Sequence, residues 1–265
     1  LAPGGAPVPG HPVRLPLVLH LLGAFLSLLQ ARQRRGAVDF DTVETQIVCN
    51  EIGRIDAIEP RKRNDAHRLI EECMLAANVC AADLMRSRKR IALYRVHEEP
   101  VPEKLELLRT YLHALGLGPA LGNEPKPHEF QQIVQATEQR PDAEQIQMML
   151  LRSMNQAVYA PTNKGHFGLA FDAYMHFTSP IRRYPDLLTH RVIKAILAGQ
   201  RFHLRALPEP HESEEPYRKR MLRNHVDKAD AGGKRAKPSE QMQRWEEAGL
   251  HSSACERRAD EASRD

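Results

Sequence analysis

The first strong pattern along the chain is an apolar run from Leu17 to Leu29, which is followed by three arginines and then Gly36. Arginine near a helix C-terminus complements the helix dipole, and glycine often ends a helix. The run therefore predicts a helix that ends near Gly36. It also looks like a signal-peptide core, but no small-x-small cleavage site follows it. It is too short to span a bilayer as a helix, so we expect no membrane association.

Alternating apolar and polar residues replace the helical pattern in the next segment. Residues 43–48 alternate, residues 51–54 include a glycine and are typical of a turn, and residues 55–58 alternate again. Two such strands on either side of a short turn predict a β-hairpin. Pro60 is expected to end the second strand.

A long helical pattern follows, with Asn64 or Asp65 as its cap and Ser87 near its end. Apolar residues at helical spacing form two neighbouring stripes on it, so most of this helix is expected to be buried. The stripes consist of Leu69, Cys73, Ala76, Cys80 and Leu84, with Ile70, Met74, Ala77 and Ala81 beside them. Cys73 and Cys80 are therefore interpreted as buried free thiols, which fits a reducing compartment such as the cytoplasm.

The rest of the chain adds one short extended segment and several helices. The expected extended segment covers 91–96, and the expected helices cover 102–115, 127–138, 142–153, a long helix that ends near Leu197, 238–248 and 254–265. Because the strands are few and short, the sequence predicts an α+β fold that is mostly helical, with a small antiparallel sheet.

Composition changes at both ends of this helical region. The start of the chain is rich in proline, glycine and alanine, whereas residues 200–238 mix charges with proline and glycine. Such segments bury little apolar surface and are typical of unstructured or solvated chain. We therefore expect an unstructured start at 1–19, a main domain at 20–199, a charged linker at 200–238 and terminal helices at 239–265.

Overall composition narrows the range of functions only slightly. Hydrophobic residues make up 42% of the chain and aromatic residues only 5%, so the core must be mostly aliphatic. The formal net charge of +4 permits a nucleic acid as partner but does not require one. None of the four cysteines forms a C-x-x-C pair, which disfavours a zinc site.

The most informative chemistry lies between Ser179 and Asp186. Arg182 and Arg183 stand at the start of a predicted helix, where cations oppose the helix dipole. A bound phosphate reverses that effect, because backbone N–H groups and guanidinium groups then converge on one anion. Asp186 lies four residues after Arg182 and could orient its side chain. The helix begins either at Pro180 or only at Pro185, with residues 180–184 then forming a tight turn.

Two readings of this turn remain open from residue chemistry. The arginines could be ordinary surface residues beside a helix cap. Alternatively, Tyr174 and His176 just upstream could supply flat faces for bases while the arginines bind phosphates, as single-stranded nucleic acid requires. A metal cluster of His166, His176 and His190 is disfavoured, because their spacing fits no single helix face and magnesium prefers oxygen ligands.

Several long segments, in this order along the chain, resemble the ribonuclease II/R family of exoribonucleases. These segments are Arg35–Thr42, Asn64–Asn78, Leu93–His97, His166–Ala170, Tyr174–Leu187, Trp245–His251 and Glu256–Asp260. The resemblance covers residues 20 to 265 and identifies the chain as the C-terminal part of the RNB catalytic domain of that family.

The resemblance implies an enzyme that hydrolyses RNA processively from its 3′ end and releases nucleoside 5′-monophosphates with the help of Mg²⁺. By motif position, Arg182 is expected to contact the scissile-end phosphate as a catalytic residue, and Arg183 to bind RNA beside it. Phe40 is expected to stack on terminal bases. Glu72 is expected to lie near the ribose hydroxyls of the terminal nucleotide, which would favour RNA over DNA.

The aspartate run that holds magnesium in this family has no counterpart in the sequence, and residues 1–19 do not resemble the family. We therefore expect a fragment, monomeric and inactive by itself, that supplies the RNA-binding and phosphate-stabilising residues. The alternative is a non-catalytic RNA-binding remnant or a non-functional truncated gene product. In either case, some apolar surface is expected to be exposed.

Overall fold

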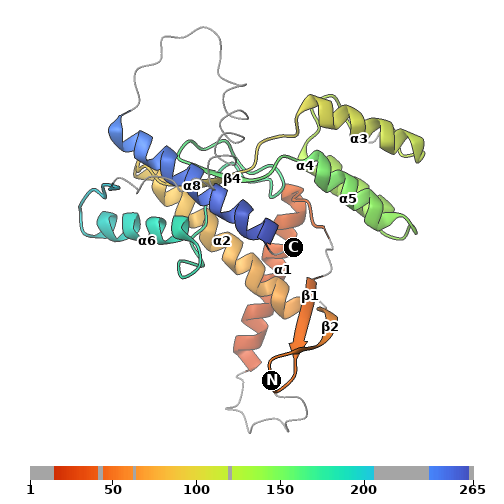
Figure 1. The fold of residues 1–265 in the computed structure, drawn as a ribbon, viewed down its shortest axis with the longest axis horizontal. Coiled ribbons are helices and arrows are strands. Elements are labelled where there is room, and N and C mark those ends of the chain that lie inside the picture. Colours follow the sequence, from red (N-terminus) through yellow and green to blue (C-terminus); the bar gives the residue numbers. More distant parts are fainter. Residues whose placement is uncertain (1–14, 41–43, 62–63, 119–120, 206–238, 263–265) are drawn as a thin grey trace. The chain divides into compact units, whose positions relative to one another are not determined.

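The computed structural model describes residues 15–40, 44–61, 64–118, 121–205 and 239–262 (Figure 1). The chain forms two compact units, and the boundary between them falls within one helix, after Met74. Unit 1 comprises residues 1–35 and 41–74, and unit 2 comprises residues 36–40 and 75–265. The described part is mostly helical with two small antiparallel sheets, which confirms the predicted α+β class.

Most of the predicted elements are present, with small shifts at their ends. In chain order they are α1 (Leu15–Arg35), β1 (Glu44–Cys49), β2 (Ile55–Arg61), α2 (Asp65–Ser87), β3 (Tyr94–Val96), α3 (Pro102–Ala114), α4 (Pro127–Thr137), α5 (Ala143–Ser153), β4 (Val158–Ala160), α6 (Tyr184–Leu197) and α8 (Glu240–Ala262).

Local signals set the ends of the first two helices. Gly36 has a φ of +72°, a left-handed conformation that glycine adopts readily, and it follows α1 as predicted. The side chain of Asn64 accepts a hydrogen bond from the backbone N–H of His67 at 3.0 Å, which makes Asn64 the cap of α2. Because α1 begins at Leu15, the expected boundary at residue 19 falls inside this helix; residues 1–14 lie outside the described residues.

The hairpin β1–β2 belongs to unit 1 and follows the predicted pairing, with Ile47 opposite Ile58. The prediction that Pro60 ends the second strand was wrong, because β2 continues to Arg61 with Pro60 opposite Thr45. In the described residues this sheet has only two strands, so each strand has one open edge. A proline whose missing N–H faces an open edge costs no inter-strand hydrogen bond.

One hydrophobic core of unit 2 lies around the β3–β4 pair, α6 and α8, with α8 beside β4 (Figure 1). Trp245 of α8 is buried there, with its ring in an edge-to-face contact with Phe202. Phe202 and Leu204, at the start of the expected linker, both pack in this core. Residues 206–238 of that expected linker lie outside the described residues.

The C-terminal helices were predicted as two segments but form the single helix α8. Its middle residue Gly249 does not break the helix. A Cβ atom at this position would lie only 2.5 Å from the carbonyl oxygen of Tyr159 in β4. Glycine is therefore required by the close approach of helix and strand. The three-residue strand β4 itself was not predicted.

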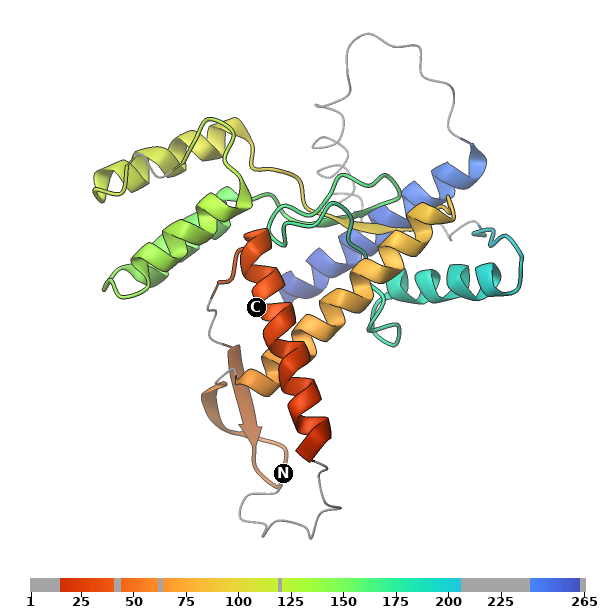
Figure 2. The same ribbon diagram turned by 180° about the vertical axis from the view of Figure 1, so that it is seen from behind.

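A second core of unit 2 fills the space between α3, α4 and α5 (Figure 2). Phe130 and Phe167 meet edge to face within it, with ring centroids 5.4 Å apart. Val38 is buried in this core and Phe40 packs against it half-buried. The backbone N–H of Val38 also donates to the carbonyl oxygen of Gly168, so residues 36–40 are tied to this unit.

The prediction that α2 is largely buried through its apolar stripes was wrong. Cys73 and Cys80 are exposed, so they are not buried thiols either. The buried residues of α2 in unit 2 are Asn78, Ala81, Ala82 and Met85. The buried face of this helix is thus made largely of small residues around one polar residue, a pattern that hydrophobic spacing does not reveal. None of the described helices is long and apolar enough to cross a membrane.

Candidate functional site

A groove of about 710 Å³ in unit 2 lies between the start of α6 and the second half of α8. It brings the two arginines singled out by the sequence together with residues of α8 that sequence analysis did not select. The lining residues are Tyr159, Arg182, Arg183, Tyr184, Pro185, His251, Ser252, Cys255, Glu256, Ala259 and Asp260.

The arginines stand on a turn and not in a helix. The helix α6 begins at Tyr184, with Arg183 as its N-cap in an extended conformation, so the later of the two predicted helix starts is correct. The N–H groups of Arg182 and Arg183 both point to the carbonyl oxygen of Ser179, at 3.4 and 3.2 Å. Residues 179–183 therefore form a tight turn, which we call the arginine turn.

Asp186 anchors both ends of the arginine turn. Its carboxylate is fully buried, and one oxygen, Oδ2, accepts from the backbone N–H of Ser179 at 2.8 Å. The same oxygen accepts from Nε and Nη2 of Arg183, at 3.2 and 2.9 Å. The expectation that Asp186 orients Arg182 through a direct contact was wrong, because the helix starts too late for that spacing to apply.

The two arginines consequently differ in what they can bind. Arg183 is largely covered and committed to Asp186, with a side chain that is 18% exposed. Arg182 is exposed, and its guanidinium group makes no hydrogen bond or ion pair with any residue that the structure describes. Arg182 is therefore the cation in the arginine turn that can meet an anion without breaking an existing contact.

Tyr174 and His176 do not line the groove. Tyr174 is buried, its ring stacks on Phe171, and its hydroxyl accepts a hydrogen bond from Nδ2 of Asn78 at 2.9 Å. Nδ1 of His176 lies 2.8 Å from the hydroxyl of Tyr159. Tyr174 is buried and His176 is half-buried, so the expectation that these two residues bind RNA directly stays a prediction.

Polar contacts hold the backbone that leads into the arginine turn. Oδ1 of Asn78 accepts from the N–H of Phe177 at 2.9 Å, while its amide nitrogen binds Tyr174. Nε2 of His190 lies 2.8 Å from the carbonyl oxygen of Phe177, and the two rings stack 4.3 Å apart. A buried amide with both ends satisfied fixes its neighbours more strictly than apolar packing alone.

Burial keeps His166 and His176 neutral. It lowers the pKa of His176 to about 2, with the positive charges of Arg183 and Arg95 adding to the effect. It also lowers the pKa of His166 to about 3, with a further contribution from His97. His166 and His176 therefore add no positive charge beneath the arginine turn at neutral pH.

One wall of the groove is closed by an ion pair. Arg95 of β3 donates to both carboxylate oxygens of Glu256 of α8, at 2.6 and 3.0 Å, and lies over the ring of Tyr159. Burial raises the pKa of Tyr159 to about 12, so its hydroxyl remains protonated. This pairing ties α8 to the β3–β4 sheet and offsets the negative charge of Glu256 within the groove.

The other two predicted site residues lie elsewhere. Phe40 packs half-buried against the α3–α5 core of unit 2. Glu72 belongs to unit 1, where it is buried and its carboxylate binds Nη1 of Arg32 at 2.7 Å. Glu72 is thus neither a surface carboxylate nor the partner of Arg68, which were the ordinary alternatives for a helical glutamate.

The described residues do not provide a set of ligands for the magnesium that the resemblance implies. Magnesium binds carboxylate and carbonyl oxygens in near-octahedral geometry. Among the described residues, no three histidine, cysteine, aspartate or glutamate side chains come together to hold a metal ion. Asp186 and Glu256 are each committed to an arginine. These residues therefore do not fit a magnesium site.

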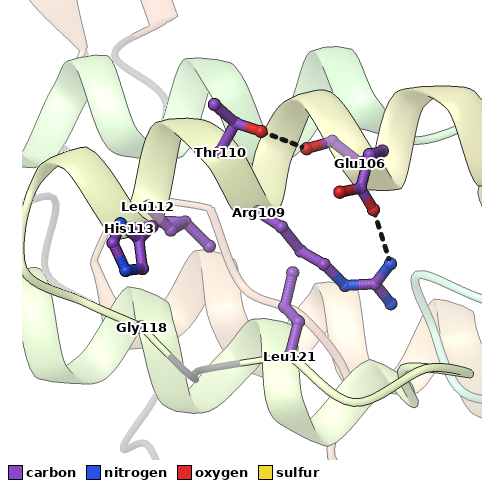
Figure 3. A pocket seen from close by; sticks show the side chains of 7 residues that line it. All are labelled: Glu106, Arg109, Thr110, Leu112, His113, Gly118 and Leu121. Carbon is purple, nitrogen blue, oxygen red and sulfur yellow. Dashed lines mark hydrogen bonds and ion pairs between the residues drawn. The ribbon is translucent and has the colours of Figure 1, made fainter.

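A second hollow, of about 380 Å³, lies beside α3 (Figure 3). Its floor contains Leu112 and Leu121, and Arg109 stands at its rim. Arg109 binds Glu106 and donates to the carbonyl oxygens of Gly122 and Asn123, which holds the loop after α3 in place. None of the site residues expected from the sequence lines this hollow, and its arginine is already committed.

Comparison with known proteins places the chain in one family. Residues 17–199 match the RNB domain family, and the chain belongs to this family. It is 42% identical to ribonuclease R of Escherichia coli K12 over 253 residues, covering 94% of this chain and 28% of that protein. It is 54% identical to ribonuclease R of Vibrio cholerae over 173 residues, covering 65% of this chain and 21% of that protein.

A solved structure shares the fold as well. The apo form of Mycoplasma genitalium RNase R superposes with a TM-score of 0.69 at 25% identity, covering 92% of this chain and 35% of that chain. The present chain thus spans only about a third or less of the length of these relatives.

Sequence reasoning missed the contribution of α8 to the groove. Ser252 and Cys255 were not selected, because small residues on a helix give no chemical signal by themselves. Tyr184 was also missed, although its position directly after the two arginines was a usable signal. It is 37% exposed and lines the groove beside Arg182.

Proposed function

We propose that this chain is part of a 3′→5′ exoribonuclease that degrades RNA processively to nucleoside 5′-monophosphates. In this proposal the groove between α6 and α8 receives the RNA strand, and Arg182 binds a phosphate near the scissile bond. One observation carries the proposal. Arg182 is an exposed guanidinium without a partner among the described residues, and it stands on a turn that buried polar contacts hold in place.

The chemistry of the groove supports this assignment. A guanidinium held in position before the reaction stabilises the charge that develops on a phosphate in the transition state. The open ring of Tyr184 can stack on a base, while the neutral histidines beneath the turn add no competing charge. The relatives are named ribonuclease R, and the Mycoplasma genitalium protein is also known in complex with a ribose-methylated single-stranded RNA.

In this proposal the described residues contribute RNA binding and charge stabilisation and not metal binding. Magnesium would be held by oxygen ligands supplied from outside the described residues. Phe40, which is half-buried here, would act as a stacking ring, and Glu72 would act as a ribose contact in exchange for its ion pair with Arg32. The protein would act in the cytoplasm as a monomer, with residues 20–199 as its main domain.

The first experiment uses the purified chain with a 5′-labelled RNA that carries a 3′ overhang, in the presence of Mg²⁺. Arg182→Ala is compared with Arg191→Ala, which removes an exposed arginine of α6 that does not line the groove. We expect Arg182→Ala to weaken binding about tenfold, the equivalent of about 1.4 kcal/mol, and to lower the salt dependence by about 0.7 in log–log slope. Arg191→Ala should leave both nearly unchanged.

Each outcome has a distinct meaning. RNA that shortens from its 3′ end, with the shortening abolished by Arg182→Ala, would show that the chain alone is a working nuclease. Binding without shortening would leave the chain as an RNA-binding part that needs residues supplied from elsewhere for cleavage. Equal loss of affinity in both variants, or no binding at all, would refute the assignment of the groove.

A further inference from the structure

The contacts of Asp186 are directed entirely at the arginine turn. This residue stands in the first turn of α6 and is 0% exposed. Each hydrogen bond that its carboxylate makes with a described residue goes to Ser179 or Arg183, the first and last residues of the turn. Pro180, Ile181 and Arg182 form the loop between them, and Ile181 is 99% exposed. One carboxylate oxygen therefore closes the base of a loop whose tip faces solvent.

A simple helix-capping role does not explain this arrangement. An acidic residue in a first helical turn interacts favourably with the helix dipole even when it is exposed. Burying a carboxylate is costly unless partners compensate for the lost hydration. Here the compensation comes from the turn itself, through the Ser179 N–H and the Arg183 guanidinium, which both bind Oδ2; Oδ1 is buried and has no hydrogen-bond partner among the described residues. Burial of Asp186 and the shape of the arginine turn thus depend on each other.

If only charge mattered, RNA would bind more tightly without Asp186. A carboxylate beside a phosphate-binding arginine lowers the local positive potential and disfavours an approaching anion. Arg183, which is adjacent in sequence to Arg182, is withdrawn from the groove by its contact with Asp186. The pair costs the site one positive charge that RNA could use, so any benefit to binding must come from geometry.

We infer that Asp186 is a positioning residue for Arg182, and that Arg183 serves by neutralising Asp186 rather than by binding phosphate. The inference rests on the proposed function of the groove and extends it. Asp186 holds Ser179 and Arg183 at fixed separation, which sets the direction in which Arg182 projects. An arginine on an untethered turn would have to be ordered at each binding event, which lowers affinity.

The test measures RNA affinity and its salt dependence by fluorescence anisotropy, with the full chain and a 5′-labelled single-stranded RNA. The variants are Arg182→Ala, Asp186→Asn, the double variant of both, and Arg191→Ala as control. Asparagine keeps an oxygen that can accept from Ser179 but gives up the charge that holds Arg183. If charge alone mattered, Asp186→Asn would bind RNA more tightly than the wild type, because it removes a negative charge and frees Arg183.

We expect the opposite result. Asp186→Asn should weaken binding about tenfold, as Arg182→Ala does, with a fall of about 0.7 in the salt slope. The double variant should bind as Arg182→Ala does to within about twofold, because residues that act through one another are not additive. If Arg182→Ala weakens binding while Asp186→Asn does not, the positioning role is refuted and the proposed function stands. If Arg182→Ala has no effect, the proposed function itself fails.

A second variant covers the case in which Asp186→Asn does not fold, as judged by circular dichroism. Arg183→Lys keeps the net charge and leaves Asp186 a cationic partner. A single ammonium group cannot reproduce the planar contact from Nε and Nη2. Charge alone therefore predicts no change in RNA affinity, whereas positioning predicts a loss of about threefold or more. Unchanged affinity and salt slope in a folded Arg183→Lys protein would overturn the inference.

Discussion

In the segment 173–192 of unit 2, side chains hold the backbone in place, whereas in the hairpin β1–β2 of unit 1 the backbone largely holds itself. Asn78 of α2 and Asp186 and His190 of α6 all bind main-chain atoms of the first segment. The hairpin has its ladder of backbone pairs and one turn side chain, Asn50, whose Oδ1 accepts from the N–H groups of Ile52 and Arg54.

The two regions also differ in what they bury. The first is built over a core that includes Met175, Leu188 and Trp245, each nearly inaccessible to solvent. In the hairpin, the isoleucines at 47, 52, 55 and 58 are more than half exposed. Side chains of α1 add Leu19 and Leu26, which are exposed to a similar degree. Much of the exposed apolar surface expected from the sequence thus lies in unit 1, although Leu107, Ile181 and Leu197 of unit 2 are exposed as well.

The geometry of the arginine turn is therefore determined within unit 2, whereas the hairpin β1–β2 of unit 1 has an apolar face that is open. A backbone segment fixed by buried polar contacts from several helices can hold an arginine in one direction. A two-stranded hairpin with exposed apolar residues is marginal by itself and gains stability mainly when its apolar face is covered. Substitutions in the two regions should therefore differ strongly in their effect on stability.

The largest effect is expected at the centre of the unit 2 core. Trp245→Ala removes a side chain that is 1% exposed and packs edge to face with Phe202. The free energy of unfolding should fall by about 3–5 kcal/mol, because the lost burial is compounded by the cavity left behind. Denaturant unfolding followed by far-UV circular dichroism measures this loss. A loss below about 1 kcal/mol would mean that this core is not tightly packed in solution.

The second effect is a dependence of stability on pH that comes from the buried histidines. His166 and His176 have their pKa values lowered to about 3 and about 2 by burial. The unfolded chain takes up protons on them below pH of about 6.5, whereas the folded protein does not. Stability is therefore unaffected by these groups above pH 6.5 and declines as the pH falls toward 3, by about 1.4 kcal/mol per pH unit for each histidine.

The histidine effect is isolated by comparing variants between pH 7 and pH 5. His176→Gln keeps an acceptor for the Tyr159 hydroxyl and removes the titrating ring. It should reduce the loss of stability over this interval by about 2 kcal/mol relative to the wild type. His113→Gln, which changes an exposed histidine of α3, should leave the loss unchanged. Fluorescence of Trp245, the single tryptophan of the chain, reports the unfolding of this core. Parallel stability curves for all three proteins would contradict the neutral state of His176.

A somewhat smaller effect is expected at Asn78, which links α2 to the segment 173–192. Asn78→Ala leaves the hydroxyl of Tyr174 and the N–H of Phe177 without their partner. Unsatisfied buried groups of this kind cost about 1–3 kcal/mol. RNA affinity should fall as well, since Phe177 leads into the arginine turn.

Asn64→Ala, at the cap of the same helix, serves as a comparison for Asn78→Ala. It removes a hydrogen bond to His67 and should cost about 1 kcal/mol of stability. Asn64 is not among the residues whose hydrogen bonds hold the arginine turn, so RNA affinity should stay at the wild-type value. Equal losses of RNA affinity in both variants would show that affinity follows stability and not the geometry of the turn.

These contrasts explain how far the sequence could lead. The helix boundaries were predictable because Gly36, Asn64 and the prolines at 102 and 127 act within one turn of the chain. The continuity of α8 was not predictable. A glycine in the sequence suggests the end of a helix, whereas Gly249 is required here because the helix packs closely against the backbone of Tyr159. Strand β4 is too short to leave a periodic signal, and its partner β3 lies about sixty residues earlier in the chain.

The same reasoning applies to the site. Arg182 could be singled out because two adjacent cations at a helix start are chemically unusual. The residues that support the arginine turn could not be singled out. Asn78 was only a polar interruption in an apolar pattern, and Asp186 had two arginines within helical reach. The arginine that Asp186 binds depends on where α6 begins. The start of α6 depends in turn on how the arginine turn packs in three dimensions.

The smallest effect on stability is expected in the hairpin β1–β2, where the apolar side chains are exposed. Ile58→Ala shortens a side chain that is 64% exposed and stands opposite Ile47 across the two strands. With both partners open to solvent, the loss should be about 0.2–1 kcal/mol, the size of a cross-strand pair. Ile52→Ala, at the turn and 84% exposed, should change stability by less than about 0.5 kcal/mol. A loss of more than about 2 kcal/mol at Ile58 but not at Ile52 would mean that the apolar face of the hairpin is covered in solution, so that unit 1, like the arginine turn, depends on side-chain contacts.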